Sequence, residues 1–258
     1  MAIDAYSAVA RTFDASFDTN LCRKAYDLLG WEAVAALPLP ADAHVIDAGC
    51  GSGRWCERFL RAGHRVTGIE PADGMVAILR ERGLGPRFTL MQSTMEDAVL
   101  PERTADLVVA IGSLQYSAAP ERAAASLLRW LKPGGRVVLM VDSLLALVQE
   151  RIRENRHEEA QHVLETRRGS FTFEERTLSL QLHDRDSIGR LLVEAGFELE
   201  QVRGLVVSAA TLGRPGCSDA MRHDAAAFLA RDKALADHPV TADGGLHLLA
   251  VARRPERS

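Results

Sequence analysis

The stretch that decides the fold is HVIDAGCGSGRW, residues 44–55. An apolar run meets Asp47, and glycines follow at the alternate positions Gly49, Gly51 and Gly53. Glycine tolerates positive φ and allows a ligand to pack directly against the backbone. In an open α/β sheet, the first strand-to-helix turn lies where the strand order reverses, and ligands bind there. The stretch therefore predicts a ligand-binding strand–turn–helix unit, with a tight turn in an ordinary α/β protein as the alternative.

The segments around this stretch alternate between short apolar runs and amphipathic runs of helical length. Strands separated by helices require right-handed crossovers, which place the strands in parallel and cover both faces of the sheet. The pattern predicts an α/β fold, a doubly wound Rossmann-like sheet. The predicted strands are residues 43–49, 64–70, 87–92, 105–113 and 136–142, and the predicted helices are residues 53–63, 73–83 and 120–135.

This alternation stops after the fifth predicted strand. A charged stretch with helical character is followed by residues 169–182, which alternate apolar and polar side chains as a hairpin does. The α/β pattern then resumes. We expect a single domain over residues 1–258, with an N-terminal helical cap (1–40), a cofactor-binding core (41–142), an insertion covering the substrate site (143–185) and the C-terminal part of the core (186–258).

Composition limits the class of function. Of the 258 residues 47% are hydrophobic, and the net charge is -4, so no basic stripe for nucleic acid is indicated. No apolar run approaches the ~20 residues that span a bilayer, and the first residues lack a secretory signal, so we expect a cytoplasmic protein. The spacing of the four cysteines fits neither a zinc site nor a disulfide framework, so we expect reduced thiols.

The polar residues around the glycines indicate the ligand. A turn that binds a dinucleotide pyrophosphate carries a third glycine where this sequence has Arg54, and Asp47 would repel a pyrophosphate. A positively charged ligand suits Asp47 better. Glu70 ends the second predicted strand, where a carboxylate can accept both ribose hydroxyls, although a surface carboxylate is the alternative. Together they predict an adenosine that bears a small positive group.

Residues 41–141 resemble the class I S-adenosylmethionine-dependent methyltransferases. VIDAGCGSG is similar to their first motif, GIEPADGM to the ribose-binding acid with its following helix, and LRWLKPGGRVVLM to their late helix–turn–strand. The resemblance implies a seven-stranded sheet whose last strand, here GLHLLAVARR, is antiparallel. It also implies S-adenosyl-L-methionine as the cofactor.

The resemblance also implies site residues, position by position. Thr94 stands where the family usually has an aspartate for the adenine amino group, so this contact differs here. An arginine at the position of Arg23 pairs with the cofactor carboxylate in the similar bacterial tRNA carboxymethoxyuridine methyltransferases; a surface arginine is the alternative. The implied cofactor-binding residues are Arg23, Asp47, Gly49, Cys50, Gly51, Glu70, Pro71, Met75, Thr94, Met95, Ile111 and Gly112.

Gln115 and Tyr116 follow the fourth predicted strand, where many relatives place residues that face the methyl acceptor. Gln115 could orient an acceptor and Tyr116 could bond to it or wall the pocket, with loop packing as the alternative. Asp142 stands alone after the fifth strand, so we expect no metal. The histidines of the insertion, among them His183, are expected to be solvated.

Aromatic residues also recur at helical spacing near the N-terminus, at Tyr6, Phe13 and Phe17. They could close over the cofactor as a lid, but core packing is the more common role of such a pattern.

Three functions remain open at this level. The first is methyl transfer to an oxygen, nitrogen or carbon of a small-molecule metabolite. The second is methylation of a tRNA wobble nucleoside, which requires a basic face; the arginines of the insertion instead alternate with glutamates, as on a solvated, self-paired helix. The third is cofactor binding without methyl transfer. We expect a monomer or homodimer, without nucleic acid or membrane as partner.

Overall fold

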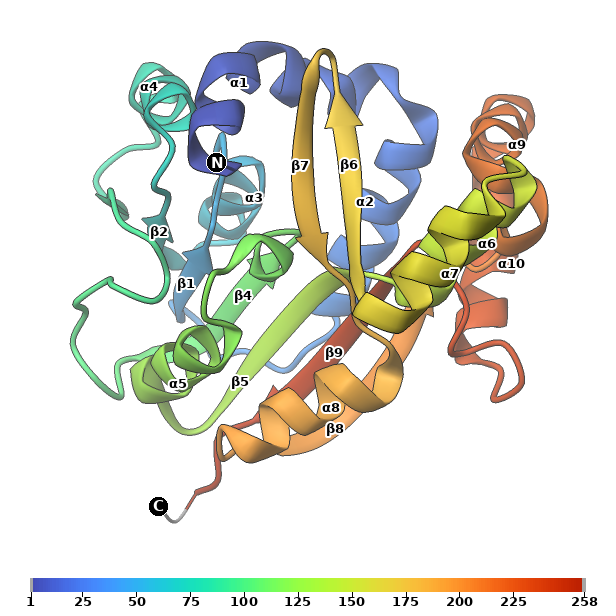
Figure 1. Ribbon diagram of the computed structural model, residues 1–258. Coiled ribbons are helices and arrows are strands. Elements are labelled where there is room, and N and C mark those ends of the chain that lie inside the picture. The colour runs from blue at the N-terminus through green and yellow to red at the C-terminus, as the bar shows by residue number, and fades with distance from the viewer. Residues whose placement is uncertain (1, 257–258) are drawn as a thin grey trace.

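A computed structural model describes residues 2–256 and contains a seven-stranded sheet (Figure 1). The strand order is β3-β2-β1-β4-β5-β9-β8, and the order reverses between β1 and β4. The first five strands are parallel, whereas β9 runs antiparallel between β5 and β8, as predicted for the last strand. The strands are β1 (His44–Ala48), β2 (Arg65–Ile69), β3 (Phe88–Met91), β4 (Ala105–Ile111), β5 (Leu131–Asp142), β8 (Glu198–Leu205) and β9 (His247–Arg253).

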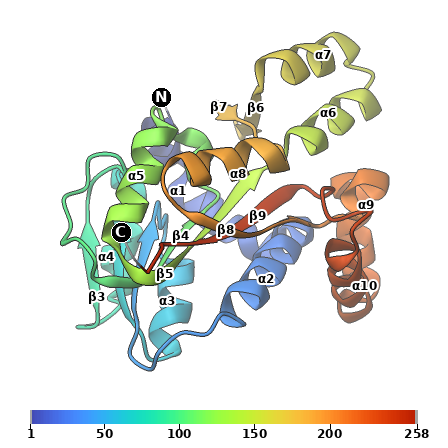
Figure 2. The ribbon, with the colours of Figure 1, turned by 90° about the horizontal axis from the view of Figure 1, so that it is seen from below.

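Helices cover both faces of this sheet, which confirms the predicted doubly wound fold (Figure 2). Side chains of β1 alternate between the two apolar cores: Val45 packs on one face and Ile46 on the other. Because both faces are buried, the central strands consist mainly of apolar residues. One face carries α2 (Leu21–Ala35), α3 (Arg54–Arg61) and α4 (Asp73–Arg82), and the other carries α5 (Pro120–Trp130) and α8 (Arg185–Glu194).

The N-terminal cap is two helices. The first, α1 (Ala2–Thr19), ends where the side chain of Asn20 accepts a hydrogen bond from Arg23 N and so caps α2. α1 packs closely on α4, because a Cβ at Gly74 would lie 2.1 Å from the carbonyl oxygen of Ser7. Only glycine at this position permits the two helices to approach so closely.

The insertion after β5 has its own small apolar core. The charged stretch with predicted helical character forms two helices, α6 (Leu144–Arg153) and α7 (His157–Thr166). The break lies at Asn155, whose φ of 60° is incompatible with a continuous helix. The predicted hairpin is β6 (Arg168–Phe173) and β7 (Arg176–Gln181), which lies beside α1 (Figure 1).

His183 contradicts the expectation of solvated histidines. Its side chain is buried, and burial lowers its pKa to about 4, so the ring is neutral near pH 7. His183 closes the insertion, since its backbone pairs with Asp142 and Leu144.

The segment between β8 and β9 is helical. It forms α9 (Ala209–His223), which bends at Gly213 (φ 66°), and α10 (Ala225–Asp237). Both helices pack on the face that carries α2. The bend in α9 directs the following segment toward the insertion, where Arg214 contacts Glu150 of α6.

Candidate active site

The three glycines of the first turn all have positive φ, but their neighbours differ. A Cβ at Gly49 would lie 2.3 Å from the Cβ of Ser113, and a Cβ at Gly53 would lie 2.4 Å from a methyl group of Leu79. These two glycines are required by packing within the chain. At Gly51, in contrast, no atom lies within 4 Å of the added Cβ. The bare backbone of Gly51 is therefore the part of the turn that is open to a ligand.

Glu70 lies at the end of β2 beside this open backbone. Its Oε2 accepts a hydrogen bond from Gly51 N at 2.8 Å, and its Oε1 accepts one from Ala72 N at 2.8 Å. Burial raises the pKa of Glu70 above its usual value, while these two amides act to lower it. The two bonds hold the carboxylate in one orientation, and each oxygen keeps a further lone pair for a ligand hydroxyl.

Asp47 lies below the turn rather than at its open surface. It is only 2% exposed, and its Oδ2 accepts a hydrogen bond from the thiol of Cys56 at 3.3 Å. Burial raises the pKa of Asp47 to about 7, and the charge of Glu70 acts in the same direction. A positively charged ligand above the turn would offset both effects, because it favours the ionised carboxylate.

The other predicted cofactor residues surround the turn. Cys50 is buried, and its backbone N–H donates to Ile69 O. Met75 packs with Ala72, which follows Pro71, and with Ala10 of α1. The side chain of Met95 lies near Gly49 of the turn. Pro71 follows the end of β2, and Ile111 and Gly112 lie at the end of β4, along the same edge of the sheet.

The hydroxyl of Thr94 forms hydrogen bonds within its own turn. Its hydroxyl donates to Asp97 Oδ2 at 3.1 Å and accepts from Asp97 N at 3.3 Å. The hydroxyl therefore closes the turn after β3, and it does not replace the carboxylate that the family usually has at this position.

Arg23 lies in a cage of four phenylalanine rings. Its guanidinium carbon is 4.6 Å from the ring centre of Phe13, and it also lies over Phe17, both from α1. Two rings of β6, Phe171 and Phe173, complete the cage at 5.8 and 5.6 Å. The buried Nη1 of Arg23 has no hydrogen-bond partner. This arginine is thus oriented by cation–π contacts and keeps its donors for an anion.

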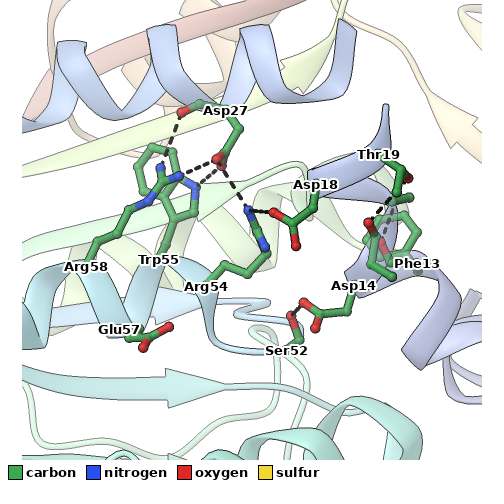
Figure 3. A network of polar contacts seen from close by, with 12 residues as sticks. Phe13, Asp14, Asp18, Thr19, Asp27, Ser52, Arg54, Trp55, Glu57 and Arg58 are labelled. Atoms are coloured by element: carbon green, nitrogen blue, oxygen red, sulfur yellow. Dashed lines mark hydrogen bonds and ion pairs between the residues drawn. The ribbon is translucent and has the colours of Figure 1, made fainter. Parts of the chain in front are cut away.

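The cap is fastened to the turn by a polar network (Figure 3). Asp27 of α2 is buried and accepts hydrogen bonds from Trp55 Nε1 at 2.8 Å and from Arg58. Asp14 of α1 accepts one from the hydroxyl of Ser52. These bonds join both cap helices to the segment that starts α3, so the cap and the turn form one unit.

Gln115 and Tyr116 lie in a short helical turn after β4. Gln115 Nε2 donates to Asp142 Oδ2 at 2.8 Å, while its Oε1 is buried without a partner. Tyr116 accepts a hydrogen bond from the hydroxyl of Tyr6 at 2.7 Å. Tyr6 of α1 therefore reaches the predicted catalytic loop, which its helical spacing alone did not indicate.

Asp142 also contacts His247, a residue that the sequence analysis did not identify. Asp142 Oδ1 lies 3.3 Å from His247 Nε2, and the imidazole lies against the ring of Tyr26, with ring centres 4.3 Å apart. Burial acts to raise the pKa of Asp142, but His247, Arg214 and Gln115 together bring it below its usual value. A buried carboxylate is therefore kept ionised at the end of β5.

A cavity of about 360 Å³ lies next to these residues, between α2, the insertion and α9. Within residues 2–256, no group of three or more His, Cys, Asp or Glu side chains is arranged to hold a metal ion. Over the same residues, no helix is long and apolar enough to cross a membrane. The cavity is lined by Asn20, Cys22, Arg23, Tyr26, Asp142, Ser143, Ala146, Leu147, Glu150, Arg151, Arg156, Ser170, Phe171, Thr172, Leu180, Leu182, Arg214 and Leu246.

Comparison with known proteins agrees with this architecture. Residues 46–139 match the family model described as a methyltransferase domain. The fold is similar to that of a solved S-adenosylmethionine-dependent methyltransferase from Listeria monocytogenes, with a TM-score of 0.65, 16% identity and coverage of 90% of this chain and 100% of the other. The resemblance to class I methyltransferases is confirmed, and S-adenosyl-L-methionine is the cofactor that it implies.

Two curated relatives match part of the chain. A trans-aconitate 2-methyltransferase from Delftia acidovorans is 33% identical over 112 residues, which are 43% of this chain and 42% of that protein. An S-adenosyl-L-methionine-dependent Diels-Alderase from Talaromyces variabilis is 31% identical over 129 residues, 48% of this chain and 42% of that protein. The chain thus spans less than half the length of these relatives, and they differ in the reaction that they catalyse.

Proposed function

We propose that this chain, which carries a class I methyltransferase domain over residues 46–139, transfers a methyl group from S-adenosyl-L-methionine to a small-molecule metabolite. The trans-aconitate methyltransferase supports an acceptor of this size. The cavity at the end of β5 supports it as well, because its volume suits a metabolite rather than a polymer.

One observation carries the proposal: the open backbone of Gly51 lies beside a carboxylate that is held in place by Gly51 N. Such a pair suits a ribose that packs against bare backbone while Glu70 accepts from its hydroxyls. Arg23 would take the cofactor carboxylate with its unpaired Nη1, since a guanidinium and a carboxylate can form paired hydrogen bonds.

When bound, the sulfonium supplies an electrophilic methyl group. An acceptor lone pair would form the new bond to the methyl carbon as the carbon–sulfur bond breaks, with S-adenosylhomocysteine as the neutral thioether leaving group. The chain must therefore align the acceptor and exclude water. Gln115 donates to Asp142 of the cavity and would orient the acceptor through its unpaired Oε1, with the hydrogen-bonded Tyr6 and Tyr116 next to this loop.

The insertion argues against a nucleic-acid substrate. Arg151 and Arg156 both pair with Glu154 and Glu159, so their charges are neutralised within the insertion rather than offered to phosphates. A tRNA wobble nucleoside remains the alternative acceptor, and RNA binding that falls steeply with salt would favour it.

The relationship to a Diels-Alderase gives a second candidate: the chain binds the cofactor and uses the cavity for a reaction without methyl transfer. The two candidates differ in one product. Methyl transfer releases one S-adenosylhomocysteine per turnover, whereas a cyclisation leaves the cofactor intact. Isotope-labelled methyl in the isolated product supports the first candidate, and product without label supports the second.

The cofactor site is tested by Glu70→Gln, which keeps the shape of the side chain and removes its charge. We expect cofactor affinity to fall about tenfold or more, because a hydrogen bond to a charged group contributes about 1.5–3 kcal/mol. Calorimetry with S-adenosylhomocysteine measures the change. Glu81→Gln, at an exposed site on α4, is the matched control and should leave the affinity unchanged. Equal affinity of the Glu70 variant and the native chain would remove the basis of the proposal.

A further inference from the structure

The cavity beside the cofactor site is rich in charged groups that come from distant parts of the chain. Arg23 comes from α2, Glu150 and Arg151 from α6, Asp142 from β5 and Arg214 from the bend of α9. These groups lie together only in the folded chain. Buried polar groups normally have hydrogen-bond partners, so donors or acceptors without a partner indicate what kind of ligand the cavity binds.

The acidic groups of the cavity are already satisfied. Asp142 accepts from Gln115 and contacts His247, and Glu150 accepts from Arg214 Nε at 3.1 Å. Arg151 contacts Glu150 as well, at 3.6 Å. Both carboxylates are therefore already paired with groups of the chain itself.

The basic groups, in contrast, keep unused donors. Among the described residues, the Nη1 and Nη2 groups of Arg214 have no hydrogen-bond partner, and only its Nε is bonded, to Glu150. The Arg214 side chain lines the cavity and is 42% exposed. Arg23 also has an unpaired Nη1, but the proposed cofactor site uses it.

We infer that the methyl acceptor is an organic acid whose carboxylate binds to the Nη1 and Nη2 groups of Arg214. The inference rests on the proposed function and names its substrate class. A carboxylate accepts hydrogen bonds through both oxygens and matches the paired donors of a guanidinium. Glu150 fixes the orientation of that guanidinium through Nε, and the bend at Gly213 brings Arg214 to the cavity. The acceptor then lies between α9 and the end of β5, beside Tyr26.

The test compares acids with their amides. With the full chain saturated by S-adenosylhomocysteine, calorimetry measures the binding of benzoate and adipate against benzamide and adipamide. We expect the acids to bind at least about tenfold more tightly, as a charge-assisted hydrogen bond contributes about 1.5–3 kcal/mol. Arg214→Gln should abolish this preference. Arg153→Gln removes a neighbouring charge and its bond to Ala210 O of α9, but it does not line the cavity, so the preference should persist.

Several outcomes overturn the inference. Acids that bind no better than their amides, or not at all, would do so, and so would a preference that survives Arg214→Gln. Tighter binding of benzylamine than of benzoate would assign the cavity to an ammonium held by Asp142. Each variant is first tested for S-adenosylhomocysteine binding. If that binding is intact, failure of the acid preference overturns this inference alone; if the native chain does not bind the nucleoside, the proposed function fails.

Discussion

The glycine turn and the acceptor cavity lie along the same edge of the sheet, but their polar groups are satisfied in different ways. At the turn, Glu70 accepts from two backbone amides and Asp47 from the thiol of Cys56. In the cavity, the Nη1 and Nη2 groups of Arg214 have no hydrogen-bond partner among the described residues. The polar side chains of the turn therefore have hydrogen-bond partners without a ligand, whereas the cavity contains donors that a ligand can pair. We call the glycine turn with Glu70 and Asp47 the scaffold of the site, and we assign the choice of substrate to the cavity.

The largest expected effect comes from a variant that disrupts the packing of the scaffold. Gly49→Ala should reduce the free energy of unfolding by about 4 kcal/mol, because it adds positive-φ strain to a collision with Ser113. Gly63→Ala is the matched control, since its φ of 89° is similar but its added Cβ has no neighbour within 4 Å. It should cost only about 1–2 kcal/mol. Denaturant unfolding measures both, and equal losses would contradict the packing role of Gly49.

A second variant, Asp47→Asn, should stabilise the folded chain while it weakens cofactor binding. The pKa of Asp47 in the folded chain is about 7, against a usual value of 3.8. Its contribution to stability is therefore fully present below about pH 4 and is lost as the pH rises through 7. Asp47→Asn removes this dependence and should stabilise the chain by about 2 kcal/mol at pH 8.

The gain from Asp47→Asn should vanish near pH 4, where the native carboxyl is also neutral. Unfolding measured at both pH values tests this. The same variant should weaken the binding of S-adenosyl-L-methionine at pH 8, since it removes a negative charge below the turn. A variant that gains stability and keeps full affinity would show that Asp47 serves the fold alone.

The smallest expected effect lies on the acceptor side. Tyr6→Phe removes the hydrogen bond to Tyr116 and should cost about 1 kcal/mol in stability. Once an acceptor is identified, its KM should rise a few-fold while kcat changes little, because Tyr116 belongs to the same short helical turn as Gln115, which is proposed to orient the acceptor. A double-mutant cycle with Tyr116→Phe measures the coupling. Additive effects of the two changes would show that the hydroxyls act independently.

Local spacing in the sequence was enough to predict the scaffold. The apolar runs and glycines gave the strands and the first turn, and Glu70 was placed correctly at the end of β2 beside that turn. Spacing did not distinguish the roles of the glycines, however. The packing of Gly49 on Ser113 and of Gly53 on Leu79 depends on segments far along the chain, so only the fold shows that Gly51 is the open one.

The acceptor side could not be predicted in this way, because its contacts join distant segments. His247 meets Asp142 only because β9 pairs with β5, and the Phe171 and Phe173 rings reach Arg23 only because the hairpin lies beside α1. The break at Asn155 was missed for a different reason: helical periodicity continues on both sides, and asparagine adopts positive φ more easily than most residues.

The position of β9 has a consequence for how the chain is made. β8 is an edge strand whose sole neighbour in the sheet is β9, and β9 is synthesised about forty residues later. On the ribosome, β8 must therefore emerge before its partner exists, with its backbone amides and carbonyls still bonded to water. The first five strands can assemble during translation, but the sheet closes only after β9 has left the exit tunnel and entered the gap between β5 and β8.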